Sequence, residues 1–267
     1  MNLNIKKILS AKGKKKLSMV TVYSYFQAKM AEEAGIDLLL VGDSYANVML
    51  GLKNTLPAST ELLLPVVEAV RRGAQNSFII ADMPFMSYQV SESEAIRNAG
   101  LFIKAGANAI KLEGGAEIAP LVKRLTDYGI PVMGHVGLTP QYVNSIGGYF
   151  VQGRDEKSVK RLVESVNALE DAGVFAIVLE LVVEEVAKVL TEEVKIPTIG
   201  IGSGKFCDGQ VLVWHDLLGI NTEFKPRFVK RYANLREEIV KALMEYAQEV
   251  KDGSFPSVEN AFREENE

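Results

Sequence analysis

Short, mostly apolar runs alternate along this chain with longer stretches in which apolar residues recur every three or four positions. The run Asp37–Val41 is almost continuously apolar, as expected for a parallel strand buried on both faces. Leu63 and Val67 fall on one side of a helix that Ser59 would cap. The same alternation predicts strands within Met19–Val22, Asp37–Val41, Phe78–Ala81, Asn108–Gly115, Pro131–Gly134, Phe175–Leu179, Pro197–Ile201 and Val211–Leu218.

Helices are expected between these strands, for example over Phe26–Ala34 and Val182–Leu190. Alternating strands and helices imply a parallel sheet, and eight such units predict an α/β fold, the (β/α)8 TIM barrel. We expect one barrel domain over residues 1–267. A short N-terminal helix and a basic loop would occupy residues 1–18, a long C-terminal helix about Ala233–Val250, and a charged tail residues 252–267. The alternative fold is a doubly wound open sheet, but no dinucleotide-binding fingerprint follows the first strand.

Composition narrows the function classes. The 267 residues are 48% hydrophobic and 24% charged, which is ordinary for a globular protein with a full core. The net charge of −4 gives no reason to expect nucleic acid, and no apolar run approaches the length of a membrane span. Because Cys207 is the single cysteine, an intrachain disulfide is excluded, and we interpret Cys207 as a buried thiol.

Polar residues stand at the ends of five predicted strands. Because active sites of barrel enzymes lie at the carboxyl ends of the strands, these residues would converge on one mouth. Lys111 and Glu113 are two positions apart and therefore point to the same face of their strand. Asp43, Ser44 or Asp82 taken singly could be helix caps, and Lys111 with Glu113 could be a structural ion pair. The whole set favours a shared functional site made of Asp43, Asp82, Glu113, His135 and Glu180.

Several carboxylates in one place repel each other unless a cation holds them together. Asp43, Asp82 and Glu113 form an oxygen-only set that suits Mg²⁺, with some of the three acting through water. Such an ion, bound to a 2-oxo acid, would polarise the ketone and stabilise an enolate. Lys111 would then neutralise the substrate carboxylate or the oxyanion, and Glu180 would be free to act as a base.

Residues 200–204, Gly-Ile-Gly-Ser-Gly, are a second candidate because the loops after the last strands of barrels often bind phosphate. A tight turn that needs positive φ explains these glycines equally well.

The sequence closely resembles the ketopantoate hydroxymethyltransferase family over nearly its whole length. The segments that carry the resemblance, in chain order, are Leu40–Ser44, Asn54–Pro57, Ala81–Phe85, Ala109–Gly115, Gly134–Gln141, Ile196–Gly202, Cys207–Val213 and Phe228–Leu235.

The resemblance implies a Mg²⁺-dependent barrel enzyme of pantothenate and coenzyme A biosynthesis. It would transfer a hydroxymethyl group from 5,10-methylenetetrahydrofolate, as co-substrate, to 3-methyl-2-oxobutanoate and give 2-dehydropantoate. The family pattern also implies a cytoplasmic homodecamer with no nucleic-acid or membrane partner. The implied roles are metal binding by Asp43, Asp82 and Glu113, substrate binding by Asp43, Ser44, Asp82 and Lys111, proton acceptance by Glu180, and an auxiliary position for His135.

Two segments beside the expected mouth depart from the family pattern. Tyr23-Ser24-Tyr25 has serine where aspartate is usual, and Tyr45-Ala46-Asn47 replaces small apolar residues. Two rival functions remain open: another Mg²⁺ and enolate enzyme of the phosphoenolpyruvate-utilising group, and an inactive barrel kept for binding or assembly. The inward set Lys111, Glu113 and Glu180 argues against the inactive barrel.

Overall fold

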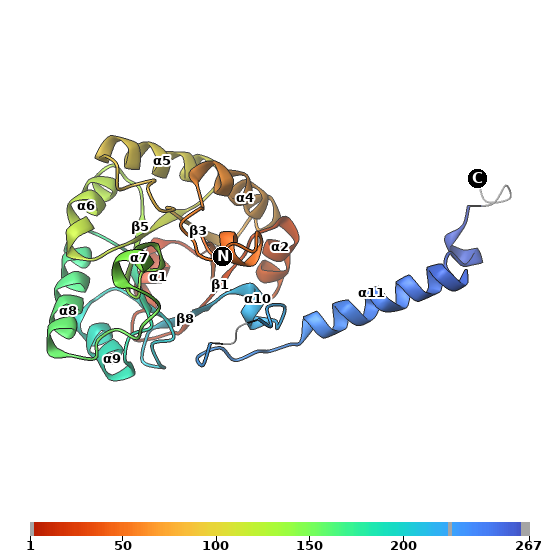
Figure 1. Ribbon diagram of the computed structural model, residues 1–267. Helices are drawn as coiled ribbons and strands as arrows, with labels where there is room; N and C mark the ends of the chain where they lie inside the picture. The colour runs from red at the N-terminus through yellow and green to blue at the C-terminus, as the bar shows by residue number, and fades with distance from the viewer. Residues whose placement is uncertain (1–2, 224–225, 263–267) are drawn as a thin grey trace. The chain divides into compact units, whose positions relative to one another are not determined.

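Eight parallel strands close into a barrel in the computed structural model, which describes residues 3–223 and 226–262 (Figure 1). Each strand pairs with the next in sequence, and the last pairs with the first. The strands are β1 Leu17–Thr21, β2 Leu38–Val41, β3 Phe78–Asp82, β4 Ala109–Glu113, β5 Val132–Gly137, β6 Ala176–Glu180, β7 Thr198–Ile201 and β8 Gly209–Leu212. The predicted (β/α)8 barrel is therefore confirmed, and the open sheet is excluded.

Helices form a ring outside the strands (Figure 1). They are α2 Tyr25–Glu33, α4 Thr60–Gly73, α5 Glu92–Lys104, α6 Ala119–Asp127, α8 Glu156–Asp171 and α9 Glu184–Glu193. Three short helices, α3 Tyr45–Val48, α7 Val143–Ile146 and α10 Trp214–Leu217, follow β2, β5 and β8 along the chain. Ser59 caps α4 as predicted, because its Oγ accepts from the Leu62 N–H at 3.3 Å. Residues 202–208, which join β7 to β8, contain no helix, so the strand–helix alternation is interrupted there.

Apolar side chains fill the barrel interior. The inner cluster includes Met19, Leu38, Ile80 and Met133, and all four are buried. The leading helix α1 (Ile5–Ser10) adds Ile8 to this cluster. The helix begins at Ile5 because the Asn4 side chain accepts from the Lys7 N–H and caps it.

The prediction for the last strand was wrong in position. We expected it within Val211–Leu218, but β8 ends at Leu212 and a helical turn, α10, follows. A short apolar run fits one helical turn as well as a strand, so periodicity could not separate them. Thr21 Oγ1 accepts from the Trp214 N–H at 3.0 Å, at the point where the chain leaves the sheet.

The chain packs as two compact units, Met1–Trp214 and His215–Glu267, and the barrel is complete within the first. The second unit contains the predicted long helix as α11, Leu235–Asp252, and Gly253 caps its C-terminal end in the left-handed conformation. Residues 1–2 and 263–267 of the predicted leading and tail segments lie outside the described part. No helix among the described residues is long and apolar enough to cross a membrane.

Candidate active site

The strand register brings the predicted polar residues together at the carboxyl end of the barrel. Asp82 of β3 is level with Lys111 of β4, and Glu113 is level with His135 of β5. Glu180, the last residue of β6, is level with Gly137. Residues that are far apart in sequence thus share one mouth, as the barrel interpretation requires.

Lys111 lies at the centre of the cluster and is 4% exposed. Its Nζ is 2.7 Å from Asp82 Oδ1, 3.1 Å from His135 Nδ1 and 4.0 Å from Glu113 Oε1. Burial lowers the pKa of Lys111, but the carboxylates of Asp82 and Glu113 outweigh it and the pKa is raised. The pair with Glu113 is therefore the weaker one, and Lys111 is not simply the partner of its neighbour two residues away.

Three buried carboxylates face this ammonium group. Burial, and then the carboxylates of Asp82 and Glu113, raise the pKa of Asp43 well above its usual range. Burial also raises the pKa of Asp82, against the opposing effect of Lys111. For Glu113 the balance is reversed, because His135 and Lys111 outweigh burial and lower its pKa. The ionised forms of Asp43 and Asp82 are therefore disfavoured in the absence of a further cation, whereas that of Glu113 is favoured.

His135 connects this cluster to Glu180. Its Nδ1 is 3.4 Å from Glu113 Oε1, and its Nε2 is 3.1 Å from Glu180 Oε2. Burial and the Lys111 ammonium lower the pKa of His135, but the two carboxylates prevail and raise it to about 9. His135 Nε2 approaches Glu180 Oε2 as an ion-pair partner, without an aligned hydrogen bond.

Glu180 is the most accessible acid of the cluster, with 19% of its side chain exposed. Its backbone is tightly constrained. Gly137 has φ +97°, and a Cβ there would lie 2.2 Å from the Glu180 carbonyl oxygen. Leu181, directly after Glu180, has φ +47°, a strained conformation for a leucine, and its carbonyl accepts from the Gln152 N–H at 2.7 Å. These constraints fix the acid at the rim, where a substrate can reach it.

The capping alternatives for Ser44 and Asp82 are not what the structure shows. Ser44 precedes α3 but makes no side-chain capping bond there, and its Oγ lies 2.7 Å from the Tyr23 hydroxyl. Asp82 Oδ2 accepts from the Asp43 N–H at 3.0 Å, which joins the two acids directly.

Gln141 is a functional candidate for which no role was predicted from the sequence. It is 2% exposed, and its Nε2 donates to Asp43 Oδ2 and to the Met83 carbonyl, both at 2.9 Å. Its backbone N–H donates to Glu113 Oε2 at 2.9 Å, and its Oε1 accepts from the Tyr88 hydroxyl at 2.8 Å. Gln141 thus fixes two of the three carboxylates. The only signal in the sequence was its place at the end of Gly134–Gln141, one of the segments that carry the family resemblance.

The departures from the family pattern have simple structural roles. Ser24 caps α2, accepting from the Gln27 N–H at 3.2 Å, and aspartate is an equally good N-cap. Tyr45 packs edge-on against Tyr23, with ring centroids 6.0 Å apart.

The glycine-rich loop fits the turn interpretation, because Gly202 and Gly204 have positive φ and Ser203 donates to the Leu179 carbonyl. Cys207 is a buried free thiol, as expected.

Asp43 and Asp82 fit a hydrated divalent ion better than a fully enclosed one. Within residues 3–223 and 226–262, no three His, Cys, Asp or Glu side chains are arranged to ligate one ion. Mg²⁺ commonly uses one or two carboxylates and keeps several waters. Asp82 Oδ1 is buried and forms its ion pair with Lys111 without an aligned hydrogen bond, so it remains available as a ligand. Direct ligation by Glu113 stays a prediction.

Comparison with known proteins identifies the family of this chain. The family model for ketopantoate hydroxymethyltransferase matches residues 2–258. A 3-methyl-2-oxobutanoate hydroxymethyltransferase from Kosmotoga olearia is 72% identical over 260 residues, covering 97% of each chain. The enzyme of the same name from Thermotoga neapolitana is 59% identical over 265 residues, covering 99% of this chain and 98% of the relative.

Solved structures share the fold at low sequence identity. A phosphonopyruvate hydrolase, in complex with oxalate and Mg²⁺, has a TM-score of 0.60 at 15% identity and covers 96% of this chain and 92% of its own. A 2,3-dimethylmalate lyase of the PEP mutase and isocitrate lyase superfamily also has a TM-score of 0.60 at 15% identity, covering 98% and 92%. These two show the barrel architecture, whereas the family match extends over almost the entire sequence. The chain belongs to the ketopantoate hydroxymethyltransferase family.

Proposed function

We propose that this enzyme transfers a hydroxymethyl group from 5,10-methylenetetrahydrofolate to 3-methyl-2-oxobutanoate and gives 2-dehydropantoate. The observation that carries the proposal is the position of Glu180, an accessible acid at the mouth whose Oε2 lies 3.1 Å from the buried His135. Asp43 and Asp82 are buried whereas Glu180 is partly exposed, so the mouth holds both an accessible base and a charge-stabilising centre. The names of the relatives support the transfer of a hydroxymethyl group to 3-methyl-2-oxobutanoate.

Asp43 and Asp82 would hold Mg²⁺, with Glu113 reaching the ion directly or through water. When bound, the ion supplies Lewis acidity at the keto oxygen of the oxo acid. The ammonium group of Lys111 would pair with the substrate carboxylate or with the oxygen that gains negative charge. Ser44, held by the Tyr23 hydroxyl, would donate to the substrate from the rim.

Glu180 would accept the proton from C3 of the oxo acid. The C3 carbanion equivalent then forms a carbon–carbon bond with the methylene carbon of the folate. Both carbon–nitrogen bonds of that methylene group break, and a water molecule supplies the hydroxyl group. The two folate nitrogens take up the proton held by Glu180 and the remaining proton of the water, and tetrahydrofolate leaves. His135 would keep the Glu180 carboxylate oriented through the 3.1 Å contact.

Proton exchange at C3 tests the first step without any folate. The protein is incubated with 3-methyl-2-oxobutanoate and Mg²⁺ in heavy water, and the C3 proton is followed by NMR. We expect exchange that disappears when the ion is chelated and in Glu180→Gln. Glu185→Gln, an exposed acid of α9, is the matched control and should exchange normally. A folded Glu180→Gln protein that exchanges at the wild-type rate would move the base elsewhere, with His135 the first residue to test.

The homodecamer and the cytoplasmic location implied by the resemblance stay predictions. Light scattering coupled to size-exclusion chromatography measures the subunit number directly.

A further inference from the structure

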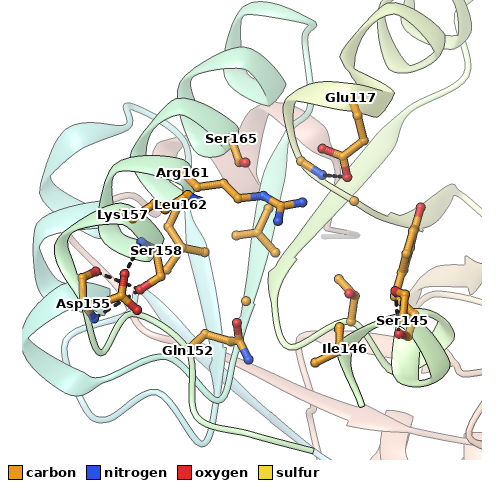
Figure 2. Close-up of a pocket in the computed structure, with 16 residues that line it drawn as sticks. Glu117, Ser145, Ile146, Gln152, Asp155, Lys157, Ser158, Arg161, Leu162 and Ser165 are labelled. Atoms are coloured by element: carbon orange, nitrogen blue, oxygen red, sulfur yellow. Dashed lines mark hydrogen bonds between the residues drawn. The ribbon is translucent and has the colours of Figure 1, made fainter. Parts of the chain in front are cut away.

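A cavity of about 480 Å³ lies beside the barrel mouth, between α7 and α8 (Figure 2). Its lining includes Gly114, which directly follows Glu113, and Val136, which directly follows His135. Cavities of this size commonly bind small molecules. Residues that directly follow two members of the candidate active site therefore line the cavity. None of the predicted catalytic or metal-binding side chains lines it.

Arg161 reaches from α8 into this cavity (Figure 2). Its side chain is exposed, and its guanidinium has no ion pair or hydrogen bond with any residue in 3–223 or 226–262. Lys157, one turn earlier on α8, adds a second positive charge. The two acids of the lining are already engaged, since Asp155 caps α8 and Glu117 Oε1 accepts from a backbone N–H at 2.9 Å. A free guanidinium in such a place is suited to bind a carboxylate of a ligand.

The loop over residues 147–153 connects this cavity with the mouth. Gln152 lines the cavity, and its Nε2 donates to the Phe150 carbonyl at 2.8 Å. Tyr149 lies close enough to the acids of the mouth for the Glu180 carboxylate to add to the effect of burial in raising its pKa. The side chains of Tyr149 and Phe150 are 54% and 56% exposed, which leaves two aromatic faces uncovered. Exposed aromatic faces of this kind stack with flat heterocycles.

We propose that the cavity and this loop bind the one-carbon donor, a reduced pteridine with an anionic glutamyl tail. This inference rests on the proposed function, since it locates the second substrate of that reaction. The tail carboxylate pairs with Arg161, and the aminobenzoyl ring lies against Leu162 and Ile146. The pteridine stacks on the Tyr149–Phe150 segment, which brings its one-carbon unit toward Glu180.

Titration calorimetry tests the assignment with two probes, tetrahydrofolate and 6-methyltetrahydropterin, which has the same reduced pterin ring system but no glutamyl tail. We expect Arg161→Gln to bind tetrahydrofolate about ten-fold more weakly or worse, the effect of losing a charge-assisted pair, and to bind the tail-free pterin like the wild type. Arg161→Lys should recover part of the loss. Arg154→Gln, an exposed arginine that does not line the cavity, is the matched control and should bind both probes normally.

Each result has a distinct meaning. If Arg161→Gln, with a wild-type melting temperature, binds tetrahydrofolate as the wild type does, the cavity is not the donor site. Equal weakening of both probes by Arg161→Gln would also overturn the assignment of the tail to this residue. If the wild type exchanges the C3 proton but binds no tetrahydrofolate, the assignments of the donor and of its pocket are both wrong, whereas the assignment of Glu180 as the base is retained. If the wild type binds tetrahydrofolate in an Arg161-dependent manner but exchanges no proton, the assignment of the pocket is retained and the proposed proton transfer is wrong.

Discussion

Gln141 offers the sharpest test of how the carboxylate cluster is organised. Replacing it by methionine keeps the length and volume of the side chain but removes every polar atom beyond the backbone. Asp43 Oδ2 and the Met83 carbonyl would each lose a donor at 2.9 Å, and the Tyr88 hydroxyl would lose its acceptor at 2.8 Å. Tyr88 keeps one partner, the Glu113 carbonyl at 2.9 Å.

The magnitude follows from what is left unpaired. A hydrogen bond to a charged group contributes about 1.5–3 kcal/mol, and each buried neutral group left unpaired costs about 1–3 kcal/mol. Because Tyr88 is still bonded, we expect the free energy of unfolding to fall by about 2–4 kcal/mol. The ionised form of Asp43 also loses a stabilising donor, so the affinity for a divalent ion should fall about 10- to 100-fold, as when the partners that orient a metal ligand are removed.

Electron paramagnetic resonance of free Mn²⁺ measures this affinity directly, at a temperature well below the melting transition of the variant. Gln210→Met is the matched control, because Gln210 is exposed and its Nε2 donates only to the Gly204 carbonyl. Wild-type Mn²⁺ affinity in a folded Gln141→Met protein would refute the reasoning. The amide would then be a packing element, and Asp43 would be held in place by other contacts.

Three further changes probe the fold and the charge balance. Gly115→Ala should lower the free energy of unfolding by about 1–3 kcal/mol in urea titrations, because its Cβ would lie 2.2 Å from Ser165 Oγ. Asp208→Asn should cost about 2–3 kcal/mol at pH 7, because Asp208 accepts from Lys12 at 2.9 Å and from backbone N–H groups. These bonds outweigh burial and lower the pKa of Asp208, so its contribution is present above the ordinary carboxyl range and disappears as pH falls through the folded pKa. Asp43→Asn should instead stabilise the metal-free protein at neutral pH, because a raised folded pKa means that ionised Asp43 costs stability there.

Each of these changes has its own check. Ser165→Gly combined with Gly115→Ala should recover part of the loss, and no recovery would place the strain elsewhere. At acid pH the free energy of unfolding should fall less steeply with decreasing pH for Asp208→Asn than for the wild type. Equal slopes would contradict the role of this carboxylate. A metal-free Asp43→Asn protein that melts below the wild type would show that the Asp43 carboxylate is a net stabilising group.

The sequence predicted the barrel because each strand is short, apolar and followed by a turn signal. It also predicted which strand ends bring polar side chains together, since alternation placed Lys111 and Glu113 on one face. It could not predict Gln141, because the bond to Asp43 joins residues 98 positions apart and the glutamine lies in a loop without periodicity. Nor could it show that Lys111 pairs more closely with Asp82 than with Glu113, which depends on the register of β3 against β4.

The charges at the mouth explain why this arrangement indicates function rather than stability. Asp43, Asp82 and Glu113 are buried within reach of one ammonium group and one imidazole, and burial of charges is costly unless each is fully paired. A fold selected only for stability would replace Asp43 with an apolar or amide side chain, because its carboxylate is repelled by the other two. A divalent ion bound by Asp43 and Asp82 would offset that repulsion. Ion binding should therefore raise the free energy of unfolding, by about 2.7 kcal/mol at an ion concentration one hundred times the dissociation constant.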